Sequence, residues 1–335
     1  MKVTLKDIAK ETGLAPSTIS KYMNHKPVSE TNRQKIEEAV KKSGYTVNEA
    51  ARSLRTRKTH TVGIISPTIG HQYWGHVISY IEQFLWEHGY STLICTHNVN
   101  SVTEYQSVQF LLDKQVDGII YIAYSQDDSC IKLIQEHKIP LVFLDNKPDI
   151  VDADFVTSQN QVGAYNAVTH LIEHGHREIA VLTTANSLYT AIERLSGYKA
   201  ALIQNHIPVR DKHIIYSSNN AGLEETQLPE LLASSSPPTA ILASSYDLGI
   251  DIITYAHQNG LKIPDDFSLV IFDDDRIFQA LNITVVRQDF SRIVEETVGL
   301  LLKKIAKTAS SPAKHIQIET RLIERSSVKF HNITI

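Results

Sequence analysis

The sequence predicts a chain of two parts: a small all-α head and a larger α/β core of two lobes, each with a parallel sheet. Three observations support this prediction. A helix–turn–helix pattern occupies residues 4–24, the balance of charge reverses after residue 58, and strand and helix patterns alternate from residue 61 onward. With 335 residues and a hydrophobic content of 42%, the chain is long enough for two or three domains that bury a substantial core.

The first predicted helix begins after Thr4. Thr4 and Asp7, three residues later, have the spacing of a capping box, and Ile8 lies among apolar residues that recur at helical spacing. Gly13 marks the end of this helix, because glycine adopts left-handed backbone angles without steric cost.

A second helix is predicted from Pro16, since the first position of a helix does not need the missing N–H. Ile19 and Met23 give it an apolar face. Short hydrogen-bonding groups and one cation occupy its other face, which is typical of a helix in a DNA major groove. These residues are Ser17, Ser20, Lys21 and Asn24. An ordinary amphipathic helical hairpin is the alternative.

A third helix is predicted between an N-cap at Ser29 and a terminating Gly44. After it, Asn48 can cap a short helix in which Leu54 is the only large apolar residue. Basic residues surround that leucine, namely Arg52, Arg55, Arg57 and Lys58. Such a short helix is marginal in water, so we expect it to form when the chain binds DNA.

The charge distribution supports a nucleic-acid partner. Residues 1–58 contain 13 Lys and Arg against 6 Asp and Glu, whereas the remaining residues contain 20 against 31. A basic head on an acidic body is the electrostatic footprint of a DNA-binding protein, although a solvated basic surface is the alternative.

Composition also excludes some classes of protein. No apolar run approaches the ~20 residues of a membrane span, and the N-terminus has no signal-peptide core, so we expect a cytoplasmic protein with no membrane partner. Cys95 and Cys130 form no CxxC pair, and we expect both to be buried reduced thiols.

The core alternates between branched apolar runs and helical patterns. This alternation predicts parallel sheets covered on both faces. The predicted strands are 61–67, 90–96, 118–122, 140–144, 179–183, 213–216, 240–243 and 269–272. The predicted helices are 74–88, 102–114, 130–137, 162–174, 193–205, 224–233 and 248–259.

The head resembles that of the lactose-repressor (LacI/GalR) family of bacterial transcription regulators in four motifs. They are Thr4-Leu-Lys-Asp-Ile-Ala, Ser17-Thr-Ile-Ser-Lys-Tyr-Met-Asn24, Gly44-Tyr45 and Asn48-Glu-Ala-Ala-Arg-Ser-Leu54. The rest resembles the periplasmic-binding-protein-like core of that family. The matching motifs are Val116-Asp-Gly-Ile, Gly175-His-Arg, Arg194-Leu-Ser-Gly-Tyr, Ile263-Pro-Asp-Asp, Phe272-Asp-Asp and Val286-Arg-Gln288.

The resemblance implies a homodimeric repressor of a metabolic, carbohydrate-related operon that binds palindromic operator DNA. Two recognition helices would enter successive major grooves, and paired hinge helices would wedge Leu54 into the minor groove. The predicted DNA-binding residues are Thr4, Pro16, Ser17, Thr18, Ser20, Lys21, Asn24, Asn48, Ala51, Arg52, Leu54 and Arg55.

The resemblance also predicts the domain boundaries. Residues 1–46 would form the helix-turn-helix domain, and residues 47–60 would form the hinge helix and linker. The N-terminal lobe of the core would comprise residues 61–161 and 291–320. The C-terminal lobe would comprise residues 162–290 and 321–335.

Ligands of such folds bind in the cleft where the strands end. A small-molecule effector, a sugar or sugar derivative, is therefore expected there, because carboxylates, an arginine and aromatic faces suit a polyol. The predicted effector-binding residues are Ser66, Tyr73, Trp74, Asp145, Arg194, Ser245, Tyr246, Asp273, Gln288 and Phe290. Alternatively, Asp145 could cap a turn, Asp273 could join an ion-pair network and Trp74 could belong to the core.

Five positions depart from the family pattern: Ala15 in place of Ser or Thr, Lys21 in place of Arg, Val47 in place of Pro, and Ser245-Tyr246 in place of Asn-Asp. Lysine cannot form the bidentate contact that arginine makes with guanine. Tyr246 could stack on a ligand or fill the cleft. In the second case, control by a protein co-regulator would replace the effector.

Motifs of enzymes and of nucleotide cofactors are absent, since there is no GxSxG, GxGxxG or P-loop. We therefore predict no enzymatic activity and no cofactor. His170, His174 and His176 form an HxxxHxH run, for which metal binding is the less favoured interpretation. A sugar-binding transport protein is the competing class, but it would need a secretion signal and would lack residues 1–58.

Overall fold

The computed structural model describes residues 3–23, 27–45, 58–70, 72–126, 128–148, 152–184, 188–217, 223, 226–307 and 312–331. The chain divides into two compact units, Met1–Thr59 and His60–Ile335. Among the described residues, no helix is long and apolar enough to cross a membrane.

The first unit contains α1 (Leu5–Thr12), α2 (Pro16–Met23) and α3 (Glu30–Ser43) around a small core. The predicted capping box is confirmed, because the backbone N–H and the hydroxyl of Thr4 both donate to the Asp7 carboxylate at 2.9 and 2.7 Å. Gly13 ends α1 with a φ of 66°. Fully buried Ile8, Ile19 and Ile36 form the centre of the core, and helical spacing predicted the first two.

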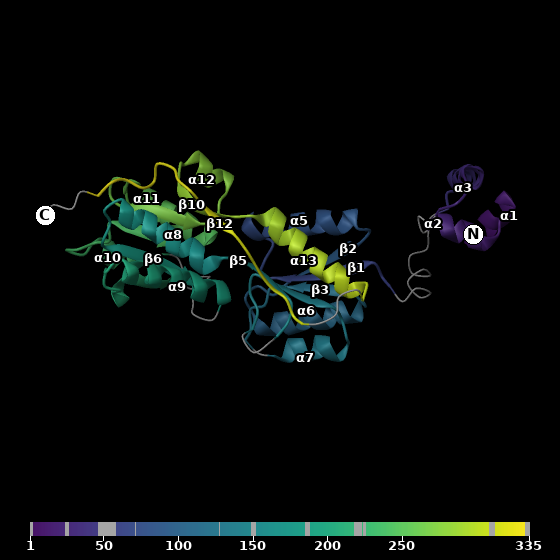
Figure 1. Ribbon diagram of the computed structural model, residues 1–335, viewed down its shortest axis with the longest axis horizontal. Helices are drawn as coiled ribbons and strands as arrows, with labels where there is room; N and C mark the ends of the chain where they lie inside the picture. Colours follow the sequence, from purple (N-terminus) through teal and green to yellow (C-terminus); the bar gives the residue numbers. More distant parts are fainter. Residues whose placement is uncertain are drawn as a thin grey trace. The chain divides into compact units, whose positions relative to one another are not determined.

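The N-terminal lobe of the second unit is a parallel sheet with helices on both faces. Its strand order is β11-β5-β4-β3-β1-β2. The strands are β1 (Thr61–Ser66), β2 (Ser91–Thr96), β3 (Gly118–Tyr121), β4 (Leu141–Leu144), β5 (Phe155–Ser158) and β11 (His315–Ile318). Figure 1 shows α5 (Gln72–Glu87) and α13 (Phe290–Ile305) on one face, and α6 (Ser101–Asp113) and α7 (Ser129–Glu136) on the other.

The C-terminal lobe repeats this architecture with the order β12-β10-β9-β8-β6-β7. Its strands are β6 (Ile179–Thr184), β7 (Ile214–Ser217), β8 (Ala240–Ala243), β9 (Ser268–Phe272), β10 (Thr284–Gln288) and β12 (Thr320–Ile323). One face packs on α8 (Asn160–Glu173) and α9 (Tyr189–Gln204). The other packs on α10 (Leu228–Leu232), α11 (Tyr246–Gln258) and α12 (Arg276–Ala280).

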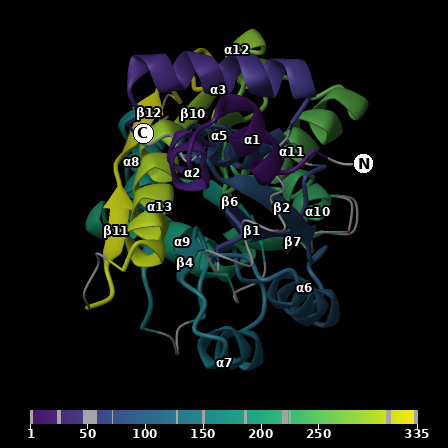
Figure 2. The same ribbon diagram turned by 90° about the vertical axis from the view of Figure 1, so that its right-hand side faces the viewer.

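The chain passes between the lobes at three single residues, Gln159, Asp289 and Glu319. As a result, the late elements α13 and β11, yellow in Figure 2, complete the N-terminal lobe. Strand β12 continues β11 after Glu319 and pairs antiparallel with β10, unlike the parallel pairs elsewhere in that sheet. This follows because the strands of both lobes end at the cleft, so a strand that leaves the cleft must run against its new neighbours.

Several elements differ from the predictions. Helix α10 begins at Leu228 rather than Glu224, with Pro229 in its first turn, where proline is tolerated because that turn's N–H is unpaired. Strands β5, β10, β11 and β12 and helices α12 and α13 were not predicted. Strands β5, β11 and β12 have four residues each, which are too few for a clear pattern. Both cysteines are free, as predicted, and Cys130 is buried. Cys95 is only partly buried, contrary to the prediction, because it lies on the edge strand β2.

Candidate functional site

A cavity of about 340 Å³ lies between the two lobes. Its walls include residues that directly follow strands of both sheets, such as Pro67 after β1, Asp145 after β4 and Asp273 after β9. The cavity is therefore at the carboxyl ends of the parallel strands, where α/β folds bind ligands.

Asp145 and Asp273 occupy equivalent positions in the two lobes. The backbone N–H of Asp145 donates to the carbonyl of Val156, and that of Asp273 to the carbonyl of Val286, each at 2.9 Å. Both aspartates have positive φ, 63° and 89°, a conformation that aspartate adopts more readily than most residues. Each backbone N–H extends the strand pairing by one residue, and each side chain lines the cavity.

The two carboxylates differ in their partners. Asp273 accepts hydrogen bonds from the Gln288 amide and, at 3.2 Å, from the backbone N–H of Tyr246. Within the described part of the chain, the Asp145 side chain has no such partner. Burial raises the pKa of Asp145 to about 6 against the attraction of Arg194, and the charge of Asp273 raises it further.

Arg194, on α9, is 5% exposed and is held rigidly. Its guanidinium carbon lies 3.7 Å from the centre of the Phe272 ring. Nε donates to the side-chain oxygen of Asn160 at 2.8 Å, and Nη1 donates to the carbonyl of Ser244 at 2.6 Å. Nη2 has no partner among the described residues, so a ligand in the cavity can accept from it.

Tyr246, the first residue of α11, lies at the rim of the cavity, which it lines without filling. Its hydroxyl donates to the side-chain oxygen of Gln72 in the other lobe at 3.3 Å, and its ring packs on Phe278. Ser245 is the N-cap of the same helix and also lines the cavity. Trp74 and Tyr73 line the cavity as well and pack on the apolar core of the N-terminal lobe.

Three predicted effector-binding residues do not line this cavity. Ser66 is fully buried, and its hydroxyl has no partner among the described residues. Gln288 lies behind the wall, where it bonds Ser158, Asp273 and Tyr73. Phe290 packs edge-on against Tyr73 at 5.3 Å. Gln288 and Phe290 therefore position residues that line the cavity.

Sequence reasoning missed His97 and Asn146, which line the cavity after β2 and β4. The backbone N–H of Val99 donates to His97 Nδ1 at 3.1 Å, so the ring is neutral and Nε2 donates to the carbonyl of Ile122. Burial lowers the pKa of His97 accordingly. The strand-end rule would have found His97 had it been applied to β2, and Asn146 had it been extended one residue beyond Asp145.

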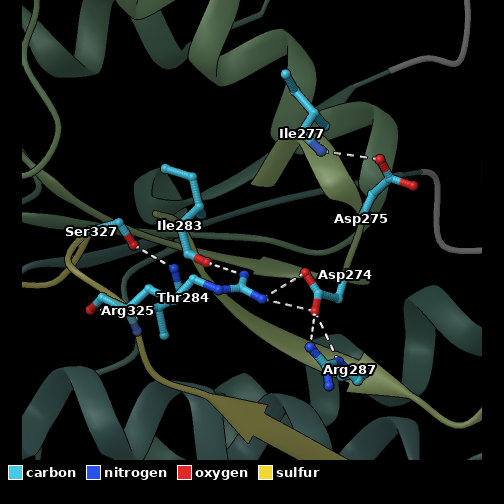
Figure 3. A network of polar contacts seen from close by, with 8 residues as sticks. All are labelled: Asp274, Asp275, Ile277, Ile283, Thr284, Arg287, Arg325 and Ser327. Carbon is cyan, nitrogen blue, oxygen red and sulfur yellow. Dashed lines mark hydrogen bonds and ion pairs between the residues drawn. The ribbon is translucent and has the colours of Figure 1, made fainter. Parts of the chain in front are cut away.

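Three consecutive aspartates follow β9 and have different partners. Asp273 lies at the cavity, whereas Asp274 accepts hydrogen bonds from Arg287 and Arg325, as Figure 3 shows. These two arginines lower the pKa of Asp274 despite its burial. Asp275 caps α12 by accepting from the backbone N–H of Ile277. The ion-pair network considered for Asp273 thus belongs to its neighbour.

On the head, α2 turns Ile19 inward and leaves Pro16, Ser17 and Lys21 exposed, while Thr18 and Ser20 are partly buried. Thr4 is exposed and caps α1. The other predicted DNA-binding residues lie outside the described residues. They are Asn24, Asn48, Ala51, Arg52, Leu54 and Arg55.

The described residues contain no group of histidines, cysteines and carboxylates placed to hold a metal ion. The rings of His170 and His174 pack against each other at an angle of 50° with their centres 4.3 Å apart, and His176 bonds Thr239 and the carbonyl of Lys329. These histidines therefore have structural partners.

A helix-turn-helix head followed by a two-lobed core with a ligand-sized interlobe cavity defines a ligand-responsive DNA-binding protein. Comparison with known proteins agrees. Residues 4–48 match the model of bacterial regulatory proteins of the lacI family, and residues 168–328 match a periplasmic binding protein-like domain. The chain is 33% identical over 312 residues to the "Probable HTH-type transcriptional regulator EndR" of Paenibacillus polymyxa, covering 91% of both chains.

It is also 28% identical to catabolite control protein A of Priestia megaterium, over 98% of this chain and 100% of the relative. A lac repressor dimer bound to operator and an anti-inducer has the same fold, with a TM-score of 0.82, 22% identity, and coverage of 98% and 100%. The chain belongs to the LacI family of bacterial regulatory proteins. It is a transcriptional regulator and not an enzyme, as the sequence predicted.

Proposed function

We propose that this regulator acts in the cytoplasm as a repressor of a carbohydrate-related operon, and that a small uncharged polyol in the interlobe cavity controls its affinity for a palindromic operator. A difference in effector affinity between two lobe arrangements would supply the coupling, typically about 1–3 kcal/mol. Residues 47–60, the predicted hinge helix and linker, would transmit that difference to the head.

The main support is the unused hydrogen-bonding capacity of Asp145 and Arg194, which both line the cavity. A buried carboxylate requires donors, and the free Nη2 of Arg194 requires an acceptor. A hydroxyl group donates and accepts, so a ligand with several hydroxyls satisfies both residues at once. Trp74 and Tyr73 offer aromatic faces for the apolar side of a sugar ring.

The charge of the cavity disfavours anionic ligands. Four aspartates line it, and Arg194 is the cation among its described lining residues (Asp145, Asp247, Asp251 and Asp273 are the aspartates). The N–H of Tyr246, which begins α11, is already bonded to Asp273, and the N–H of Thr190 on α9 is bonded to Asn146 at 3.3 Å. One N–H at the start of each of these helices is therefore already bonded to a side chain, which leaves fewer donors for a phosphate.

Thermal unfolding with a panel of neutral sugars, hexuronates, sugar phosphates and nucleobases tests this proposal. A ligand at a hundred times its dissociation constant stabilises the native state by about 2.7 kcal/mol. We expect a neutral sugar to raise the melting temperature of the wild type and of the exposed-site control Asp113→Asn, but not of Asp145→Asn. A shift from sugar phosphates or hexuronates alone would contradict the uncharged class. No shift from any compound would favour a protein co-regulator.

The proposed homodimer has a matching surface on the N-terminal lobe. The edge strand β2 and helix α6 expose Ile94, Val102, Tyr105 and Phe110, between 36% and 64% exposed. Large apolar side chains gathered on an edge strand and its neighbouring helix are typical of a surface that another chain covers. Sedimentation of Tyr105→Asp should show monomers where the wild type shows dimers, with Tyr216→Phe as the control.

A further inference from the structure

The rim of the cavity carries polar contacts between the lobes that no family motif predicted. Gln72, at the start of α5, faces Tyr246 and Asp275 of the C-terminal lobe. Its amide nitrogen donates to Asp275 Oδ1 at 3.1 Å, and its amide oxygen accepts from the Tyr246 hydroxyl at 3.3 Å. One turn further along α5, His76 Nδ1 lies 3.8 Å from Asp275 Oδ2.

Both ends of the Gln72 amide are therefore engaged across the cleft. A primary amide offers a donor and an acceptor on opposite atoms, and here each atom has a partner of the complementary kind. Removal of the Gln72 amide would leave both the Tyr246 hydroxyl and the Asp275 carboxylate without this partner. Both hydrogen bonds persist only while the two lobes keep their present separation at this rim.

The half of this arrangement in the C-terminal lobe is preorganised. The Asp275 side chain is 6% exposed and also caps α12. The preceding Asp274 is fixed by Arg287 and Arg325, which anchors the loop (Figure 3). Tyr246 is held by its N–H bond to Asp273 and by its ring contact with Phe278. Gln72 by contrast is exposed, so we expect these contacts to break by movement of its side chain.

We propose that Gln72, Tyr246 and Asp275 form a clasp that holds the two lobes together at the rim of the cleft and so controls how often the cleft opens to a ligand. The proposal rests on the proposed function only in treating the cleft as the effector site. In the clasp, Tyr246 limits the access of a ligand to the cavity. Its N–H fixes Asp273 at the cavity wall, while its hydroxyl closes the rim.

Hydrogen–deuterium exchange of the full chain, without effector or DNA, tests the clasp. The wild type is compared with Gln72→Ala and with the conservative Tyr246→Phe. The reporter is the segment 188–191, in which the Thr190 N–H bonds Asn146 of the other lobe. We expect exchange there to accelerate roughly three- to tenfold in both variants, the change that loss of one or two ordinary hydrogen bonds produces.

Two controls and a double variant make the result decisive. Gln83→Ala on the same helix and Tyr216→Phe on β7 remove similar groups away from the rim, and neither should change exchange at residues 188–191. The combined variant Gln72→Ala/Tyr246→Phe should exchange no faster than Gln72→Ala alone, because both remove the same bond. Wild-type exchange in both single variants, or additive acceleration in the double variant, would overturn the clasp. Since no effector is used, failure to find one would not affect this outcome.

Discussion

At the scale of single residues, the Asp145 carboxylate combines a stability cost with its proposed binding role. Burial and the nearby Asp273 raise its pKa from 3.8 to about 6, and Arg194 offsets this only in part. A carboxyl whose pKa is raised by folding binds its proton more tightly in the native state. Its contribution to stability is therefore greatest below pH 4 and is lost as the pH rises through 6.

Asp145→Asn should consequently stabilise the protein without ligand at neutral pH. We expect a gain of up to about 3 kcal/mol above pH 7 that shrinks as the pH falls from 6 toward 4. Urea denaturation at several pH values measures this gain, with Asp113→Asn as the exposed control. A gain that is the same at every pH would show that the pKa of Asp145 is not raised by folding.

Lys21 is the exposed cation of α2 and stands where the family usually has arginine. We predict that Lys21→Ala changes base preference at one position of each half-site, and that Lys21→Arg favours guanine there by about 1–3 kcal/mol. Selection of binding sites from random DNA with each variant gives the measurement. An affinity loss that is uniform across sequences would instead make Lys21 a phosphate contact.

At the scale of elements, the close packing of α8 and α9 determines the position of Arg194. A Cβ atom on Gly197 would lie 2.1 Å from the backbone oxygen of Gln161. Gly197→Ala should therefore push the helices apart, destabilise the core by about 1–3 kcal/mol or more, and weaken the bond between Arg194 and Asn160. Chemical denaturation and the polyol thermal shift should both detect this.

Gly299→Ala is the matched control for this prediction. Gly299 also lies in a helix, α13, but nothing lies within 4 Å of a Cβ placed on it. Alanine should stabilise the protein there by roughly 0.5–1 kcal/mol, because glycine is the poorer helix former. If both substitutions had the same effect, helix propensity rather than the α8–α9 contact would explain Gly197.

The elements also show how far the sequence could predict the fold and the site. Local signals were sufficient for the capping box at Thr4 and the left-handed Gly13, because both depend on neighbours within a few residues. The strand-end rule placed Asp145 and Asp273 for the same reason. The four-residue strands β5, β11 and β12 were missed, because short strands acquire their role only from the sheet they join.

Side-chain direction at the site required tertiary structure. Ser66, Gln288 and Tyr246 all stand near strand ends in the sequence, yet only Tyr246 lines the cavity. Gln288 lies behind the wall because its amide bonds three side chains from both lobes. The rim contact between Gln72 and Tyr246 joins residues 174 positions apart, which no local pattern indicates.

At the scale of the whole molecule, the lobes are joined by single residues at three crossings, so they can shift relative to each other with little local rearrangement. The clasp at the rim and the bond between Thr190 and Asn146 connect the lobes at other points. An effector that changes the balance among these contacts changes the arrangement of the lobes. A regulator of this kind needs that change to reach the DNA.

Substitution of Leu54 tests the predicted contact between the hinge and the DNA. If Leu54 wedges into a central base step, the unstacking cost of a few kcal/mol is offset only on DNA that the dimer bends and contacts fully. Leu54→Ala should then weaken operator binding at least tenfold while leaving binding to random duplex almost unchanged. Fluorescence anisotropy with both DNAs gives the two affinities. Lys58→Ala, which removes a nearby charge, should weaken both about equally. Equal losses on both DNAs for Leu54→Ala would rule out the wedge.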